Sequence, residues 1–336
     1  MAPLGFLKYY LFLHVAVFIL FPNSSHAADH RLPDSNKHVA LFVFGDSLFD
    51  VGNNNYINTT TTMQANFWPY GETFFNHATG RGSDGRLIPD FIAEYAKLPL
   101  LQPYKQPGNN HQFSNGVNFA SAGAGALVQT HQGMVIDLNM QLIYFKNVKK
   151  VLEQHMGETE VKKILLTAVY LFSIGNNDYL SHFMTNDSSF FKLNSPEDYA
   201  KMVIGNITDV IKEIYEAGGR KFAFVSLAPL DCVPLVRALN PAGECSQELT
   251  ALFKLHSFED GKSACCGSGP YRGVTSCGGK RGVKEFELCS NPSEFVFFDA
   301  AHPTERLNEQ LAQQMWSATT PRIVGPYNLE ALFKQV

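Results

Sequence analysis

The chain alternates short, wholly apolar runs with longer stretches in which apolar residues recur every three or four positions. The short runs are rich in Val and Phe and do not alternate strictly with polar residues, which is typical of strands buried on both faces. Because these runs alternate with helix-period stretches, the pattern predicts an α/β fold whose parallel sheet is covered by helices on both faces. The expected strands are Val39–Phe44, Val117–Ala120, Val169–Ser173, Phe222–Leu227 and Phe295–Phe298.

The helix-period stretches predict helices over Val135–Met156, Pro196–Ala217 and, at the end of the chain, Thr304–Trp316. The second of these has clear ends. Ser195 offers a capping hydroxyl directly before a first-turn proline, and the pair Gly218-Gly219 stops the helix.

The N-terminus has the pattern of a secretory signal peptide. Lys8 precedes the apolar run Tyr9–Phe21, which is too short to span a membrane comfortably. Ser25-His26-Ala27 then supplies the small residues that a signal peptidase reads, so we expect cleavage after Ala27 and a secreted, extracellular protein. The alternative is an uncleaved anchor. Residues 28–336 are expected to form a single domain with a disulfide-rich C-terminal third.

The charge and hydrophobic content of the chain limit the kinds of molecule that it is expected to bind. The 336 residues are 45% hydrophobic and 17% charged with a net charge of −4, which indicates a globular protein with an ample core. Since this balance leaves no basic patch, it argues against nucleic acid or an anionic membrane as partner. We expect a monomer without stable membrane insertion.

Cysteines and sequons agree with an oxidising, extracellular setting. An even number of cysteines in a secreted chain predicts disulfides, with 15 connectivities open to the six. A local Cys232–Cys245 pair is expected, with the other four pairing among themselves. The sequence contains no Cys-x-x-Cys pair, which argues against a metal site formed by these cysteines. The cysteines are Cys232, Cys245, Cys265, Cys266, Cys277 and Cys289, and the sequons that predict glycans are at Asn58, Asn186 and Asn206.

Four of the expected strands end in polar or glycine-rich sequence. Because the carboxyl ends of parallel strands meet at one edge of the sheet, where open α/β sheets bind their ligands, we expect these four segments to converge. They are Gly45-Asp46-Ser47, Ser121-Ala122-Gly123-Ala124-Gly125, Gly175-Asn176-Asn177-Asp178 and Asp299-Ala300-Ala301-His302.

This edge contains the parts of a serine nucleophile. Ser47 on its own is more often a helix cap, but a serine with a base and an orienting acid in reach can attack an acyl carbon. Asp299 and His302 are three residues apart, so the carboxylate can hold Nδ1 and leave Nε2 facing the serine. A capping or surface role remains the alternative for His302. Asp46, next to the nucleophile, is interpreted as structural.

The same edge offers donors for an oxyanion. The backbone amides of Ser47 and Gly123 and the side-chain amide of Asn177 could together bind developing negative charge. Ordinary alternatives are close packing for the glycine and a turn for the asparagine. No Gly-x-Ser-x-Gly elbow is present.

Six ordered blocks resemble the plant GDSL esterase/lipases of the SGNH hydrolase superfamily. They are "FVFGDSLFDVGNNN", "WPYGETFF", "SDGRLIPDFIAEYAKLPLL", "GVNFASAGAG", "SIGNNDY" and "DAAHPTE", and they span nearly the whole mature chain. Within the family, the chain looks most similar to secreted lipases linked to defence.

The resemblance implies a flavodoxin-like three-layer α/β/α fold and hydrolysis of carboxylic esters without metal or cofactor. By position it implies a catalytic triad of Ser47, Asp299 and His302. It also implies an oxyanion hole formed by Ser47, Gly123 and Asn177.

One segment departs from the family. Leu255-His256 runs almost directly into Asp260-Gly261, where the family carries a further strand and helix, so the chain is expected to lack one strand-helix unit.

Three functions therefore stay open. The leading one is a secreted esterase or lipase that works through an acyl-enzyme. The others are an acyltransferase with the same triad and a catalytically impaired relative that binds acyl ligands.

Overall fold

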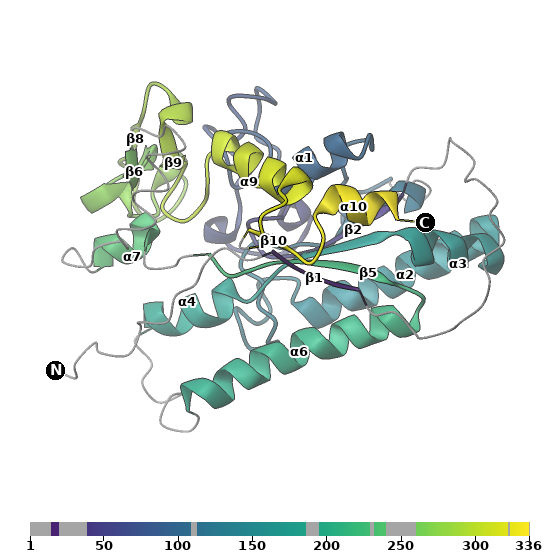
Figure 1. The fold of residues 1–336 in the computed structure, drawn as a ribbon. Coiled ribbons are helices and arrows are strands. Elements are labelled where there is room, and N and C mark those ends of the chain that lie inside the picture. The colour runs from purple at the N-terminus through teal and green to yellow at the C-terminus, as the bar shows by residue number, and fades with distance from the viewer. Residues whose placement is uncertain are drawn as a thin grey trace.

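A mainly parallel sheet forms the centre of the protein (Figure 1). The computed structural model describes residues 15–19, 39–108, 113–185, 195–228, 232–239, 260–321 and 323–335. Within these ranges the central sheet has six strands in the order β10-β1-β5-β4-β2-β3. They are β1 (Val15–Ile19), β2 (Leu41–Gly45), β3 (Gly116–Asn118), β4 (Val169–Ser173), β5 (Lys221–Val225) and β10 (Val324–Gly325).

The strands β3, β2, β4 and β5 are parallel to one another, which confirms the first four expected strands. After β2 the chain first adds β3 on one side and then returns to add β4 and β5 on the other. The direction of winding therefore reverses between β2 and β4. The segments beyond the carboxyl ends of these two strands occupy the place where open α/β sheets bind ligands.

Aromatic residues pack across the parallel strands. Phe44, Phe172 and Phe224 are aligned partners on β2, β4 and β5, and their ring centroids lie 4.7 and 5.0 Å apart in stacked geometry. Such cross-strand pairs stabilise a sheet beyond the area that they bury. They also disfavour a slip in register, because a shift by one residue would turn each ring to the opposite face.

Helices cover both faces of the sheet, as Figure 1 shows. Phe42 and Phe44 enter a core formed with α2, α3 and α6, whereas Leu41 and Val43 enter a second core formed with α1, α9 and α10. This is the expected three-layer α/β/α arrangement. The helices are α1 (Ile88–Tyr95), α2 (Leu138–Met156), α3 (Glu158–Thr167), α4 (Asn176–Thr185), α6 (Pro196–Glu216), α7 (Pro234–Leu239), α9 (Glu305–Ser317) and α10 (Leu329–Lys334).

The expected helices are found as α2, α6 and α9, although α9 is followed by the short helix α10. The cap predicted for α6 is present, since the hydroxyl of Ser195 accepts a hydrogen bond from the backbone amide of Asp198. That bond satisfies one of the amides that the first turn of a helix leaves without a partner.

Phe295–Phe298 was correctly expected to form a strand, but the expectation that this strand belongs to the central sheet was wrong. This segment forms β9 (Phe295–Phe297) and pairs in parallel with β6 (Asp260–Ala264) in a separate two-stranded sheet. β7 (Cys266–Gly267) and β8 (Glu287–Leu288) form another small, antiparallel sheet. An apolar run shows that a strand is buried, but the choice of neighbouring strand depends on segments distant in sequence.

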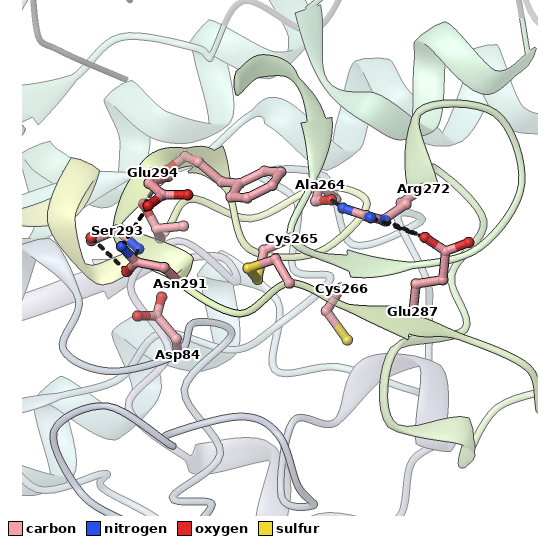
Figure 2. Close-up of a disulfide and its surroundings, with 12 residues drawn as sticks. Asp84, Ala264, Cys265, Cys266, Arg272, Glu287, Asn291, Ser293 and Glu294 are labelled. Carbon is pink, nitrogen blue, oxygen red and sulfur yellow. Dashed lines mark hydrogen bonds and ion pairs between the residues drawn. A yellow bond between two sulfur atoms is a disulfide. The ribbon is translucent and has the colours of Figure 1, made fainter. Parts of the chain in front are cut away.

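Disulfides hold this C-terminal part together. Cys265 pairs with Cys289 and Cys266 with Cys277, which confirms that these four cysteines pair among themselves. Figure 2 shows Cys265 and Cys266 beside Arg272, whose guanidinium donates to the carbonyl of Ala264 and to Glu287. Cys245 lies outside the described residues, so its pairing with Cys232 stays a prediction.

Strand β1 comes from the segment expected to be a signal peptide. It pairs antiparallel with β5, with Val15 opposite Val225 and Ile19 opposite Lys221, and in parallel with β10 on its other side. It therefore lies between β5 and β10 in the sheet. Cleavage after Ala27 stays a prediction. The shortened segment at Leu255-His256 lies outside the described residues.

Candidate active site

The three residues expected to form a triad line one pocket. Ser47, Asp299 and His302 contribute to its wall together with Ala122, Arg281 and the segment Thr62–Ala65. Ser47 is the second residue after β2, at the carboxyl edge of the sheet where the winding reverses. Asp299 and His302 follow β9, so the small C-terminal sheet, rather than the central one, positions them.

Asp299 holds the imidazole of His302. Its Oδ1 accepts a hydrogen bond from Nδ1 of His302 at 2.7 Å and two more, each at 2.9 Å, from the backbone amides of Ala301 and His302. Asp299 is 4% exposed. An acid fixed in this way assigns the proton to Nδ1, which leaves Nε2 as the free basic nitrogen.

The pKa values of Asp299 and His302 are shifted in the directions that their hydrogen bond predicts. Burial alone would raise the pKa of Asp299, but the charge of His302 and its hydrogen bond hold that pKa well below its usual range. Burial alone would lower the pKa of His302, but the charge of Asp299 and the hydrogen bond between them hold it above its ordinary value. Each partner therefore favours the charged form of the other.

Ser47 lies in a turn and caps no helix in the described part of the chain. Asp46 stabilises this turn. Its Oδ1 accepts a hydrogen bond from the backbone amide of Leu48 at 3.0 Å, and its carbonyl accepts hydrogen bonds from the amides of Phe49 and Asp50. The serine side chain is thereby left half-buried at the pocket. Within the described residues no hydrogen bond joins Ser47 to His302. Catalytic hydrogen bonds are often long until substrate binds.

Among the hydrogen bonds of the described residues, those of the Asp46 side chain go to Leu48 and Asn176 and not to His302. Oδ2 of Asp46 accepts from the side-chain amide of Asn176 at 3.1 Å, and the Asn176 oxygen accepts from the amide of Ala228 at 2.8 Å. Burial raises the pKa of Asp46 to about 6. The pair ties the end of β2 to the segment that follows β4, which agrees with a structural role for Asp46.

The three expected oxyanion donors differ in their contacts. Among the hydrogen bonds of the described residues, none uses the backbone amide of Ser47 or of Gly123. Asn177 donates one hydrogen of its side-chain amide to the carbonyl of Ala124 at 2.9 Å. Gly123 has a φ of +83°, and a Cβ there would lie 2.5 Å from Sδ of Met63. The left-handed backbone conformation favours glycine here, whereas the Met63 side chain is flexible and could move aside for a Cβ.

Buried polar residues that the sequence did not single out hold the Gly123 segment in place. Asp178 accepts from the amides of Ala126 and Leu127 at 2.8 and 3.0 Å and from the hydroxyl of Thr130 at 2.6 Å. Asn54 donates to the carbonyl of Ala122 at 2.9 Å. Both residues stand in polar runs after buried strands, which was the available signal in the sequence.

The other predicted sites are only partly described. Asn58 is exposed, Asn206 is half-buried on α6 and donates to the carbonyl of Met202, and Asn186 lies outside the described residues. In the described part of the chain, no group of three or more histidine, cysteine or acidic residues could hold a metal ion. No helix in that part is long and apolar enough to cross a membrane.

Known proteins match most of the chain. The family model for "GDSL-like Lipase/Acylhydrolase" matches residues 41–315. "GDSL esterase/lipase 1" of Arabidopsis thaliana is 48% identical, with 88% of this chain and 90% of the relative covered. "GDSL lipase" of Tanacetum cinerariifolium is 42% identical over 89% of each chain.

A more distant relative from Arabidopsis thaliana, "Inactive GDSL esterase/lipase-like protein 25", is 33% identical over 87% of this chain and 74% of its own length. The alignment with the first relative runs over 338 positions and yet covers only 88% of this 336-residue chain, so that relative has residues without a counterpart here. This agrees with a shortened segment. From the family match and these identities, the chain belongs to the plant GDSL esterase/lipase family of carboxylic ester hydrolases.

Proposed function

We propose that this chain is a secreted serine esterase that hydrolyses esters of lipids or small molecules through a covalent acyl-enzyme. The observation that carries the proposal is the hydrogen bond between Asp299 and Nδ1 of His302, in a pocket that Ser47 also lines. A serine, a base and an acid that orients the base are the groups that acyl transfer to a hydroxyl requires.

In the proposed reaction, Oγ of Ser47 attacks the acyl carbon of the ester while Nε2 of His302 takes the proton of the Ser47 hydroxyl. Collapse of the tetrahedral intermediate breaks the bond to the alcohol, which leaves with the proton from His302. Water then attacks the acyl-enzyme with the same base, which releases the carboxylic acid and restores Ser47. Asp299 keeps the imidazole oriented and stabilises its positive charge in both steps.

The free amides of Ser47 and Gly123 are proposed to bind the oxyanion, with the remaining amide hydrogen of Asn177 as a third donor. Support comes from the hydrogen bonds of the described residues, none of which uses the backbone amides of Ser47 and Gly123. An unpaired backbone amide is costly unless a ligand or water satisfies it. Preorganised donors of this kind stabilise charge that develops only in the transition state.

Secretion and glycosylation belong to the same proposal. The disulfides Cys265–Cys289 and Cys266–Cys277 support an oxidising compartment, and the exposed Asn58 is accessible to a glycan. An acyltransferase would use the same residues, with an alcohol in place of water as the second acceptor.

The test is labelling of the purified protein with a fluorophosphonate, which reacts only with an activated serine. We expect label on Ser47, and none in Ser47→Ala. Ser317→Ala is the matched control, because Ser317 is exposed on α9 and donates only to the carbonyl of Gln313. A folded wild-type protein that takes no label would overturn the proposal and favour the acyl-binding alternative. Product analysis with an added alcohol separates hydrolysis from acyl transfer.

A further inference from the structure

The second oxygen of the Asp299 carboxylate has its own buried partner. The hydroxyl of Tyr70 donates to Oδ2 of Asp299 at 2.5 Å, although the two residues are 229 positions apart. Tyr70 is 1% exposed, and its ring packs edge-on against Phe67 and Phe298. A hydroxyl that donates to a carboxylate at this distance makes a strong, charge-assisted hydrogen bond.

Arg281 sets the direction of that hydroxyl. Its Nη1 donates to the Tyr70 oxygen at 2.9 Å, so the Tyr70 hydrogen is free to point at Asp299. The same guanidinium donates through Nη2 to the carbonyl of Gln64 at 2.9 Å and through Nε to that of Thr61 at 3.2 Å. Arg281 is 7% exposed, and it lines the pocket beside Gln64. It thus joins the wall of the pocket to the acid of the proposed triad.

We propose that Tyr70 and Arg281 are positioning residues of this site, which fix the carboxylate of Asp299 so that Oδ1 holds the imidazole of His302. The inference rests on the proposed function, since it assigns a role toward the same triad. Tyr70 holds the carboxylate of Asp299 directly, and Arg281 holds it through Tyr70.

The charges around the imidazole predict a signature in the pH profile. His302 is influenced by the carboxylates of Asp299 and Asp46, which raise its pKa, and by Arg281, which lowers it. Loss of the positive charge at Arg281 leaves the two carboxylates unopposed. The pKa of His302 should then rise, and the acid limb of kcat/KM should move to higher pH, because imidazolium cannot accept the serine proton.

Removal of the Tyr70 hydroxyl acts in the same direction. With no donor at Oδ2, the charge of Asp299 is less dispersed and holds the imidazole proton more tightly. The carboxylate also loses one of the contacts that fix its rotamer, so kcat should fall while KM for a small ester stays nearly unchanged.

The experiment measures p-nitrophenyl acetate hydrolysis against pH for wild type, Tyr70→Phe, Arg281→Gln and Arg281→Lys. We expect Tyr70→Phe to lower kcat by about 10-fold, as for the loss of one buried hydrogen bond to a charged group, and to move the acid limb upward. Arg281→Gln should move the limb in the same direction. Arg281→Lys keeps the charge and should return the limb toward its wild-type position.

Tyr170→Phe is the matched control. Tyr170 is equally buried, and its hydroxyl makes one hydrogen bond, to the carbonyl of Leu165 at 3.0 Å, beside the core of α2, α3 and α6. It should lower the melting temperature without changing the pH profile. If wild type labels at Ser47 and Tyr70→Phe leaves both kcat and the acid limb unchanged, the positioning role is overturned while the esterase proposal stands. Should Tyr70→Phe fail to fold, an unchanged acid limb in Arg281→Gln overturns it equally.

Discussion

Replacement of Asp299 by Asn tests how the acid supports catalysis. In the native site, Oδ1 of Asp299 accepts from the backbone amides of Ala301 and His302 as well as from Nδ1 of His302. An amide NH₂ cannot face three donors, so the oxygen of an asparagine should take the place of Oδ1. Its NH₂ should then face Tyr70, and His302 should keep its proton on Nδ1.

The cost of Asp299→Asn is therefore the loss of charge, without a change of tautomer. Two unit charges about 4 Å apart interact by about 4 kcal/mol at an effective dielectric constant of about 20, which corresponds to roughly 10³ in rate. The amide dipole retains part of this, so kcat should fall by about 10² to 10³. A reversed tautomer would cost about 10⁴, the value for the equivalent change in a serine protease.

The assay is kcat/KM for p-nitrophenyl acetate across the titration of the histidine. Because Asp299 holds the pKa of His302 above its ordinary value, the acid limb should move to lower pH in Asp299→Asn. Stability should fall by about 1 to 3 kcal/mol, since the Tyr70 hydrogen loses its acceptor. A fall in kcat of less than 10-fold with an unmoved acid limb would show that Asp299 does not act on His302.

Two further predictions follow from the oxyanion donors and from the sheet. Asn177→Ala should lower kcat by about 10² to 10³ with little change in KM, as for loss of one oxyanion donor; a change confined to KM would make Asn177 a substrate-binding residue. A relative's segment inserted after His256, in a chain that starts at Ala28 and so lacks β1, should raise the melting temperature by supplying a strand beside β5. Equal melting temperatures and equal ester hydrolysis with and without the insert would refute the idea of a missing unit.

The local part of the site could be predicted from the sequence. β2 and β4 are buried on both faces and therefore have continuous apolar sequence, and the polar residues that follow them stand out. Asp299 and His302 are three residues apart, a separation at which a single turn can bring the carboxylate to the imidazole, and the two side chains do meet. The rule that ligands bind at the carboxyl ends of parallel strands correctly placed Ser47 at that edge of the central sheet, but it did not apply to Asp299 and His302, because β9 lies outside that sheet.

The rest depended on contacts between distant segments. Nothing in the apolar run of β9 shows that it pairs with β6 instead of joining the central sheet, because the pairing depends on a segment more than 30 residues earlier in the chain. Tyr70 and Arg281 carry no local signal either. In the sequence, each looks like an ordinary residue of a polar loop. Tyr70 contacts Asp299 and Arg281 contacts Tyr70 only because folding brings residues more than 200 positions apart into one buried network. Such a network is set by the geometry of the whole packed chain, since a hydrogen bond between buried groups forms only when every segment that carries a partner is already in place.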